Sequence, residues 1–590
     1  MARLRSFIAF VPLLFPLGSA LVASGCDVLF PSSPDPAPVP NEMFVIHSVR
    51  ADSVGYVTNR EKRVTIVLPA DMTALADPAA DVRDTSDTVV WSCTVQGPLT
   101  DSGTGATYYV GDFTPFNTPG SYYIAVPSLT TANGMAKSAT FKIGPDVFRS
   151  VITSGMLGFY GQRCGTSVNI STNGQNWSHK ACHANDAYQT YLDGVMSDTI
   201  KPSLHGWHDA GDYGKYTTNG AFTVGMMLMA FEHFGPTLST LPLPIPEKGG
   251  TFPDFLDEVK WQLDWLLTTQ GIDGSVSFKV TAQSFEQFVM PEADGARRYY
   301  TPVSTSATAD FAAAMAQASR VYRPYDGALA DTYLAAARLS YAFLKANGLI
   351  KPDVSMFGTG NYDANSGDSD NRLWAAAEMW ETTGEPEFLT DFEASPVSIA
   401  VADNFDWDNV GNLGMFTYLL SAKTGRDQAK VDLLTASAIA SANTIALRAD
   451  AAAFGRGLTN YWWGSNGAVA RLSMNLWVGG LLSPTDADRF RDAIAMQLDH
   501  LLGRNIYDRT QVTGVGYHPP NKPHHRPSEA DNVGVAWPGL LVGGANPDAD
   551  RNVLPALTWK DNSDDYDLNE VAINWNAPLI YAAAALTPPL

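Results

Sequence analysis

The spacing of hydrophobic residues divides the chain into an N-terminal part with strand-like patterns and a longer part with helical patterns. Before about residue 142, short runs rich in β-branched and aromatic residues are separated by Gly, Pro and Asp. These runs are 64–68, 88–91, 108–110 and 122–126. Their length and spacing predict a small β-sandwich of about a hundred residues.

From about residue 146 the apolar residues recur every three or four positions, as in 256–267, which predicts amphipathic helices. Comparable helical segments are 252–269, 305–322, 327–346, 372–383, 428–448, 486–502 and 571–586. About a dozen such helices joined by long Gly/Pro/aromatic loops predict one helical toroid, and long loops between regular helices are where function is expected. We find no dinucleotide-binding G-x-G-x-x-G, no P-loop and no G-x-S-x-G elbow.

The N-terminus has the pattern of an export signal. Arg3 and Arg5 precede an apolar run, and Ala23-Ser24-Gly25-Cys26 resembles a bacterial lipobox in which Cys26 is lipidated. We therefore expect a signal peptide at 1–25, a Pro-rich linker at 26–43 and an exported lipoprotein of the cell envelope or cell surface. Cleavage by an ordinary signal peptidase, which would give a secreted protein, is the alternative.

The net charge and the number of cysteines argue against some classes of partner and favour a metal site. The 590 residues include 61 acidic and 39 basic ones, for a net charge of −22, which argues against nucleic acid or anionic lipid as partner. We expect membrane contact only through the lipid anchor. With Cys26 lipidated, three cysteines remain, and an odd number in an exported chain argues against a disulfide framework and favours a metal site.

Chemistry-bearing residues concentrate first in 205–216, His-Gly-Trp-His-Asp-Ala-Gly-Asp-Tyr-Gly-Lys-Tyr. Asp209 and Asp212 are close enough that both do not ionise freely, so one acquires a raised pKa or shares a proton or water with the other. Trp207, Tyr213 and Tyr216 offer flat apolar faces suited to sugar rings. The alternative is a helix start, with Asp209 as cap and Asp212 in the first turn.

A second group of candidate functional residues lies near the C-terminus. In 559–577 a loop rich in acids and Asn runs into an apolar helix with Glu570 at its mouth, where partial desolvation would raise the pKa of Glu570 towards the range of a general acid. The alternative is an ordinary first-turn acid. Upstream, Pro523-His524-His525-Arg526 is a stiff loop that offers fixed donors, and its paired histidines are also compatible with a metal site.

Together these segments resemble glycoside hydrolase family 9, which includes many cellulases. The family's C-terminal signature is met by Trp559, Asp561, Tyr566, Glu570, Ala572, Asn576 and Ala577, and its Pro-His-x-Arg signature by Pro523, His524 and Arg526. The segments 207–213, 501–505 and 541–544 match as well, although His518 stands where Asn, Lys or Arg is usual. The N-terminal part, with 52–56 and 141–149, resembles the immunoglobulin-like domain that precedes some members.

The resemblance implies an all-β immunoglobulin-like sandwich at 44–145 followed by an all-α (α/α)6 barrel at 146–590. It implies hydrolysis of β-1,4-glucan with inversion, in which Glu570 is the general acid, Asp212 the base and Asp209 a residue that helps to hold the water. The implied substrate-binding residues are His524, Arg526, Tyr566, Asp561 and Trp463. Trp463 would be a stacking platform, and a core indole is the alternative.

Two metal sites are expected. Cys164, Cys182, His183 and His208 form a Cys₂His₂ set suited to tetrahedral zinc, as in related enzymes that carry the sandwich domain. A Cys164–Cys182 disulfide is the alternative, and His205 is an alternative to His208. Glu247 and Asp254, with Gly250 and Thr251, resemble a family calcium site, for which a capped turn is the alternative.

The sequence therefore predicts a monomeric endo-β-1,4-glucanase that acts on β-1,4-glucan or cello-oligosaccharides without an organic cofactor. An exo-acting β-glucosidase or exo-β-glucosaminidase of the same family is the first alternative, because the negative charge would suit cationic polymers. A non-catalytic glycan-binding lipoprotein is the second, and the joint presence of Asp209, Asp212 and Glu570 argues against it.

Overall fold

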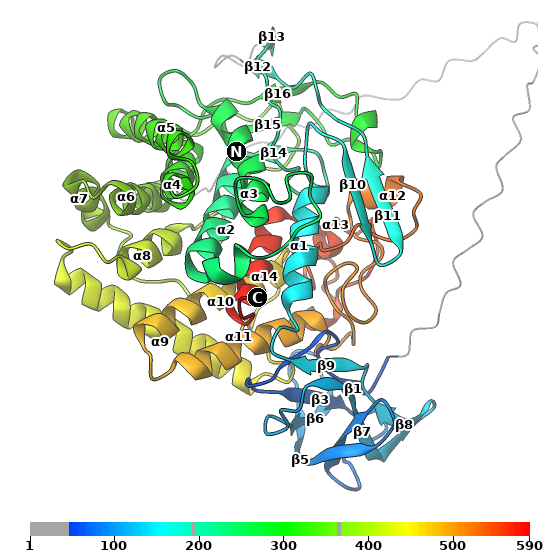
Figure 1. Cartoon of the computed structure of the whole chain (residues 1–590). Helices are drawn as coiled ribbons and strands as arrows, with labels where there is room; N and C mark the ends of the chain where they lie inside the picture. The colour runs from blue at the N-terminus through cyan, green and yellow to red at the C-terminus, as the bar shows by residue number, and fades with distance from the viewer. Residues whose placement is uncertain (1–45, 191–195, 363–366) are drawn as a thin grey trace, which may run out of the picture. The chain divides into compact units, whose positions relative to one another are not determined.

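The computed structural model describes residues 46–190, 196–362 and 367–590. The predicted signal peptide, the linker and Cys26 lie outside these residues. A sheet-rich N-terminal part is followed by a helical part, so the predicted fold class is confirmed (Figure 1). None of the helices in the described ranges is both long and apolar enough to cross a membrane.

The N-terminal part is a two-layered β-structure whose strands pair in the order β1-β3-β6-β5-β4-β7-β9-β2, with β8 on β7. The long strand β5 joins the layers, because its first half pairs with β4 and its second half with β6. Aromatic and β-branched side chains such as Tyr56, Ile66 and Phe141 fill the space between the layers. The strands are β1 Val49–Arg50, β2 Gly55–Val57, β3 Arg63–Val67, β4 Ala79–Asp84, β5 Val89–Thr100, β6 Thr107–Asp112, β7 Gly120–Thr131, β8 Gly134–Lys137 and β9 Phe141–Gly144.

The helical part is a double ring of helices in the described residues. The inner helices are α2 Thr217–Leu238, α4 Thr305–Tyr322, α6 Ser369–Thr383, α8 Gly411–Leu420, α10 Ser465–Leu482 and α14 Ile573–Ala585. The outer helices are α1 Arg149–Gly161, α3 Asp254–Thr269, α5 Gly327–Ala346, α7 Pro386–Ala394, α9 Gln428–Ala451 and α11 Ala487–Leu502. The last helix, α14, packs between α2 and α10 and thereby joins the end of the ring to its beginning.

The pattern of buried residues distinguishes the helices of the inner ring from those of the outer ring. Inner helices such as α2 and α10 are buried around most of their circumference, whereas α5 buries only one stripe that includes Tyr333, Ala337 and Tyr341. A stripe spaced at three and four residues is what an outer helix needs in order to pack on one side and face water on the other. The inner helices form the core of this part.

Smaller elements lie in the connections and shape one end of the barrel. A hairpin is formed by β10 Val168–Thr172 and β11 Gln175–His179. A five-stranded sheet comprises β12 Tyr188–Thr190, β13 Met196–Ile200, β14 Lys215–Tyr216, β15 Lys279–Ala282 and β16 Arg298–Tyr300. The short helices are α12 Arg526–Ala530, α13 Tyr566–Asn569 and the 3₁₀ turns Pro291–Ala293 and Pro555–Leu557.

Polar contacts around Ser53 connect the sandwich to the helical part. The Ser53 hydroxyl donates to the Leu502 carbonyl at the end of α11 (2.7 Å) and accepts from the Tyr517 backbone N–H (2.8 Å). Next to it, Asp52 of the sandwich and Asp499 of α11 are both buried and face each other. One oxygen of each carboxyl group has no other hydrogen-bond partner, so the pair is arranged to share a proton.

Candidate active site

The loop that carries Asp209 is fixed from outside by helix α3. The Trp207 indole N–H donates to the buried carboxylate of Glu258 (2.8 Å), and the Trp207 backbone N–H donates to the Gln262 side chain (2.7 Å). Helix α2 begins only at Thr217, so neither aspartate lies in its first turn. The helix-cap alternative for these residues is therefore wrong.

Asp209 is buried and held by two donors. The Asn219 amide donates to its Oδ1 and the Tyr362 hydroxyl to its Oδ2, each at 2.7 Å. Burial raises the pKa of Asp209 to about 7, helped by the charge of Asp212, while the two hydrogen bonds oppose the rise. Asp209 therefore changes its charge near neutral pH.

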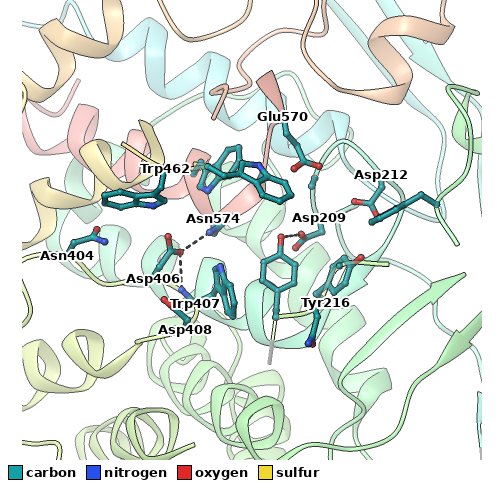
Figure 2. A pocket seen from close by; sticks show the side chains of 18 residues that line it. Asp209, Asp212, Tyr216, Asn404, Asp406, Trp407, Asp408, Trp462, Glu570 and Asn574 are labelled. Carbon is teal, nitrogen blue, oxygen red and sulfur yellow. Dashed lines mark hydrogen bonds between the residues drawn. The ribbon is translucent and has the colours of Figure 1, made fainter. Parts of the chain in front are cut away.

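Asp212 and Glu570 reach the same pocket as Asp209 from different segments of the chain. The pocket has a volume of about 470 Å³, within the range of ordinary ligand sites. All three carboxyl groups gather at one end of it (Figure 2). Asp212 comes from the loop before α2, whereas Glu570 follows α13 and is bridged to His524 on a neighbouring segment.

Glu570 is in an environment that favours its neutral form. Burial raises the pKa of Glu570 well above its usual range, and the charges of Asp212 and Asp209 add to the rise, while Arg526 opposes it. A carboxylic acid that keeps its proton at neutral pH is what a general acid needs.

Several tryptophan side chains line the pocket. Trp407, Trp462, Trp463 and Trp575 belong to its wall. Trp463 is 47% exposed and packs edge-on against the exposed ring of Tyr566, with 5.4 Å between the ring centroids. The alternative of a core indole for Trp463 is therefore wrong, because its ring faces the solvent side of the pocket.

Two of the predicted sugar-contacting residues, His524 and Arg526, are not among the described residues that line the pocket. The guanidinium of Arg526 is bound by the Glu286 carboxylate (2.6 Å), and the His524 ring nitrogen Nδ1 lies 2.6 Å from the Ser563 carbonyl. Both residues are close to Glu570, but neither is among the residues that line the pocket in the described part of the chain. Their contact with sugar stays a prediction.

The carboxylate of Asp561 is hydrogen-bonded within the protein. Its carboxylate accepts from the Arg509 guanidinium (2.8 Å), from the backbone N–H groups of Asn521 and Lys522 (2.9 Å each) and from the Asn569 amide (3.1 Å). Through these bonds Asp561 anchors the loop around Lys522. Its contact with a substrate stays a prediction.

The predicted zinc ligands meet in one cluster. One ligand atom from each of Cys164, Cys182, His183 and His208 lies within 4.8 Å of all the others, and both cysteines are free thiols. The disulfide alternative is therefore wrong. His205 lies elsewhere, with its ring against Trp261.

The donor set of this cluster fits zinc. Two sulfurs and two imidazoles are a closed tetrahedral set. His183 turns Nδ1 toward the Cys164 sulfur (3.5 Å), and its Nε2 lies 3.2 Å from the Asp294 carboxylate, as is usual for a metal-bound imidazole.

The predicted calcium ligands have partners within the protein. Both carboxylate oxygens of Glu247 accept from the Arg163 guanidinium, at 2.9 and 3.2 Å. Those of Asp254 accept from the backbone N–H groups of Leu243 and Gly249. Across the described ranges, the Cys/His cluster is the one group gathered as a metal site, and calcium stays a prediction.

Several residues that line the pocket or contact Asp209 were not found from the sequence. Tyr362, Asn219, Asn574, Asp406 and Trp407 lie on four different segments, and no local pattern links them. The position of Asn574, four residues after Glu570 in the C-terminal motif, was the one available signal.

Comparison with known proteins agrees with this geometry. Residues 148–583 match the model of glycosyl hydrolase family 9, and residues 46–131 match that of the cellulase N-terminal ig-like domain. Endoglucanase D of Acetivibrio thermocellus is 44% identical over 542 residues, which cover 91% of this chain and 83% of that protein.

Solved structures of the same family superpose closely. A metagenome-derived family 9 endoglucanase has a TM-score of 0.83 at 34% identity and covers 92% of this chain and 99% of its own. A Zn-binding triple mutant of the family 9 endoglucanase J30 has a TM-score of 0.82 at 28% identity, covering 91% and 100%.

Proposed function

The chain belongs to glycosyl hydrolase family 9, and we propose that it is an endo-β-1,4-glucanase that inverts the anomeric configuration. The observation that carries this proposal is the meeting of Glu570, Asp212 and Asp209 at one end of a pocket lined by tryptophans. The endo mode is supported by the relatives, since Endoglucanase D and the metagenome-derived enzyme are both endoglucanases by name.

In the proposed reaction, Glu570 donates its proton to the glycosidic oxygen as the bond to the anomeric carbon breaks. Its raised pKa supports this role because the proton is still present at neutral pH. Asp212 takes a proton from a water that attacks the opposite face of the sugar. Inversion requires the acid and the base to stand about 6.5–9.5 Å apart so that this water fits between base and sugar.

Asp209 is proposed as a second acceptor for the attacking water. Its ionised form serves this purpose, and the donors Asn219 and Tyr362 stabilise that form and fix its direction. The tryptophans of the pocket wall would stack on neighbouring sugar rings. Their polar neighbours, such as Asn404 and Asp408, would meet sugar hydroxyls.

We further propose that the Cys/His cluster holds zinc. A zinc ion with four protein ligands has no open position, so it would supply structural cross-linking and no catalysis. His208 directly precedes Asp209 in the chain, so its fixation would also fix the start of the catalytic loop. Measurement of the zinc content of the purified protein tests this assignment.

We also propose that the protein is exported and lipid-anchored through Cys26. The support is the sequence Ala23-Ser24-Gly25-Cys26 after an apolar run. Metabolic labelling with a radioactive fatty acid should mark the wild type and leave Cys26→Ala unlabelled. Equal labelling of both would contradict the anchor.

The endo activity is tested on carboxymethylcellulose by following viscosity and reducing ends together. The proposal predicts a steep fall in viscosity with few new reducing ends, and no fall for Glu570→Gln. Release of single sugars without loss of viscosity would favour the exo-acting alternative. Cleavage of chitosan oligomers in preference to cello-oligosaccharides would overturn the glucan assignment.

A further inference from the structure

Asn574, in the first turn of α14, lies between three parts of the active site. The preceding residue, Ile573, donates its backbone N–H to the Asp209 carbonyl (2.9 Å). The Asn574 side-chain oxygen accepts from the Asn219 amide (3.4 Å), which also donates to the Asp209 carboxylate. Asn574 is buried, and it follows Glu570 on the same segment.

On its other side Asn574 reaches the loop that carries Trp407. Its amide donates to Asp406 Oδ1 (2.9 Å), the same oxygen that accepts the Trp407 backbone N–H (2.9 Å) (Figure 2). Asp406 is held in place by an ion pair with the fully buried Arg471. The direction of the Trp407 backbone is therefore set by the carboxylate that Asn574 binds.

A second set of contacts connects Trp407 to Asp209. The Trp407 indole packs edge-on against the Tyr362 ring, with centroids 5.0 Å apart, and the Tyr362 hydroxyl donates to Asp209. Each carboxylate oxygen of Asp209 is thus tied to the Trp407 loop, one through Asn219 and Asn574 and the other through Tyr362. By contrast, the exposed Trp463 of the same pocket packs against Tyr566.

We propose that Asn574 is a positioning residue that couples the sugar platform Trp407 to the orientation of Asp209. This inference rests on the proposed glucanase function and deepens it. A sugar ring that stacks on Trp407 contacts a loop that is connected to Asp209 through Asn574. Part of the binding energy of that sugar ring therefore appears as a higher kcat. The contact of Trp463 leads to Tyr566 and not to Asp209, so the effect of its loss should not depend on Asn574.

The test is a double-mutant cycle on a soluble cello-oligosaccharide that fills the pocket, with kcat and KM measured separately. We expect Asn574→Ala to lower kcat by about tenfold, the effect of one lost hydrogen bond to a charged group. Trp407→Ala, which removes the sugar platform, should lower kcat by a similar factor. The double variant should then have a kcat within about twofold of that of the less active single variant. The reason is that Trp407→Ala removes the sugar platform at one end of the connection and Asn574→Ala removes a hydrogen bond within it.

The matched control pairs Asn574→Ala with Trp463→Ala, for which the fold-losses should multiply. Losses that multiply for Trp407 and Asn574 as well would overturn the coupling and indicate two independent sugar contacts. A wild-type enzyme that fails to cleave β-1,4-glucan would overturn the proposed function instead. Melting temperatures of all variants identify losses of kcat that come from unfolding.

Discussion

Replacement of Tyr362 by Phe should move the acidic limb of the pH–rate profile. The change removes the hydroxyl that donates to Asp209 Oδ2 at 2.7 Å and keeps the ring that packs against Trp407. Because this hydrogen bond stabilises the ionised carboxylate, its loss raises the pKa of Asp209.

The size of the pKa change follows from the strength of the hydrogen bond between Tyr362 and Asp209 that is lost. A hydrogen bond to a charged group contributes about 1.5–3 kcal/mol, and about 1.4 kcal/mol corresponds to a pKa change of one. The pKa of Asp209, about 7 in the intact protein, should therefore rise to between about 8 and 9. At pH 7 the ionised fraction would fall from about one half to between about 1 and 10%.

The assay is kcat/KM on a soluble cello-oligosaccharide from pH 5 to pH 10, for wild type, Tyr362→Phe and Tyr216→Phe. Tyr216 is a matched control, because it lines the same pocket and its hydroxyl interacts with Thr359. We expect the acidic limb to shift upward in Tyr362→Phe alone. A folded Tyr362→Phe enzyme with an unmoved acidic limb would refute the assignment of that limb to Asp209.

Three further predictions concern other parts of the molecule. Glu570→Gln should lower kcat by about 10²–10⁴-fold with an unchanged melting temperature, and near-normal turnover would exclude it as the acid. Cys164→Ser should lose zinc in elemental analysis together with thermal stability; wild-type protein without zinc would disprove the site. Burial raises the pKa of Asp499 to about 8 in the folded protein, whereas in the unfolded chain Asp499 ionises at a lower pH. The free energy of unfolding should therefore fall as pH rises from about 4 to about 8. Denaturant titrations should show this fall and its reduction in Asp499→Asn, and equal slopes in the two proteins would exclude the contribution.

The helices that were predicted from the sequence belong to both rings. The pattern in 327–346 coincides with α5, which buries one stripe of side chains, and that in 486–502 differs from α11 by one residue. Helices α2 and α10, which are buried on most sides, were not located, whereas the equally buried α4 coincides with the prediction at 305–322. The strands 64–68 and 108–110 were found near β3 and β6, since short β-branched and aromatic runs stand out locally.

The site was predictable where one segment carries the chemistry and unpredictable where tertiary contacts assemble it. The sequence indicated Asp209, Asp212 and Glu570 through their spacing and motifs, and the structure brings all three into one pocket. It did not show that the signature residue Asp561 anchors a loop through Arg509. Nor did it indicate Tyr362, because its relation to Asp209 exists only after the chain folds across 153 positions.

The stereochemistry of the first product tests the central claim most directly. Proton NMR of a cello-oligosaccharide digest, recorded before mutarotation, reports the configuration at the newly formed reducing end. If Glu570 protonates the leaving oxygen while Asp212 directs water to the opposite face, the α-anomer appears first. Initial formation of the β-anomer would mean that the configuration is retained, and the assignment of Asp212 as base would be contradicted.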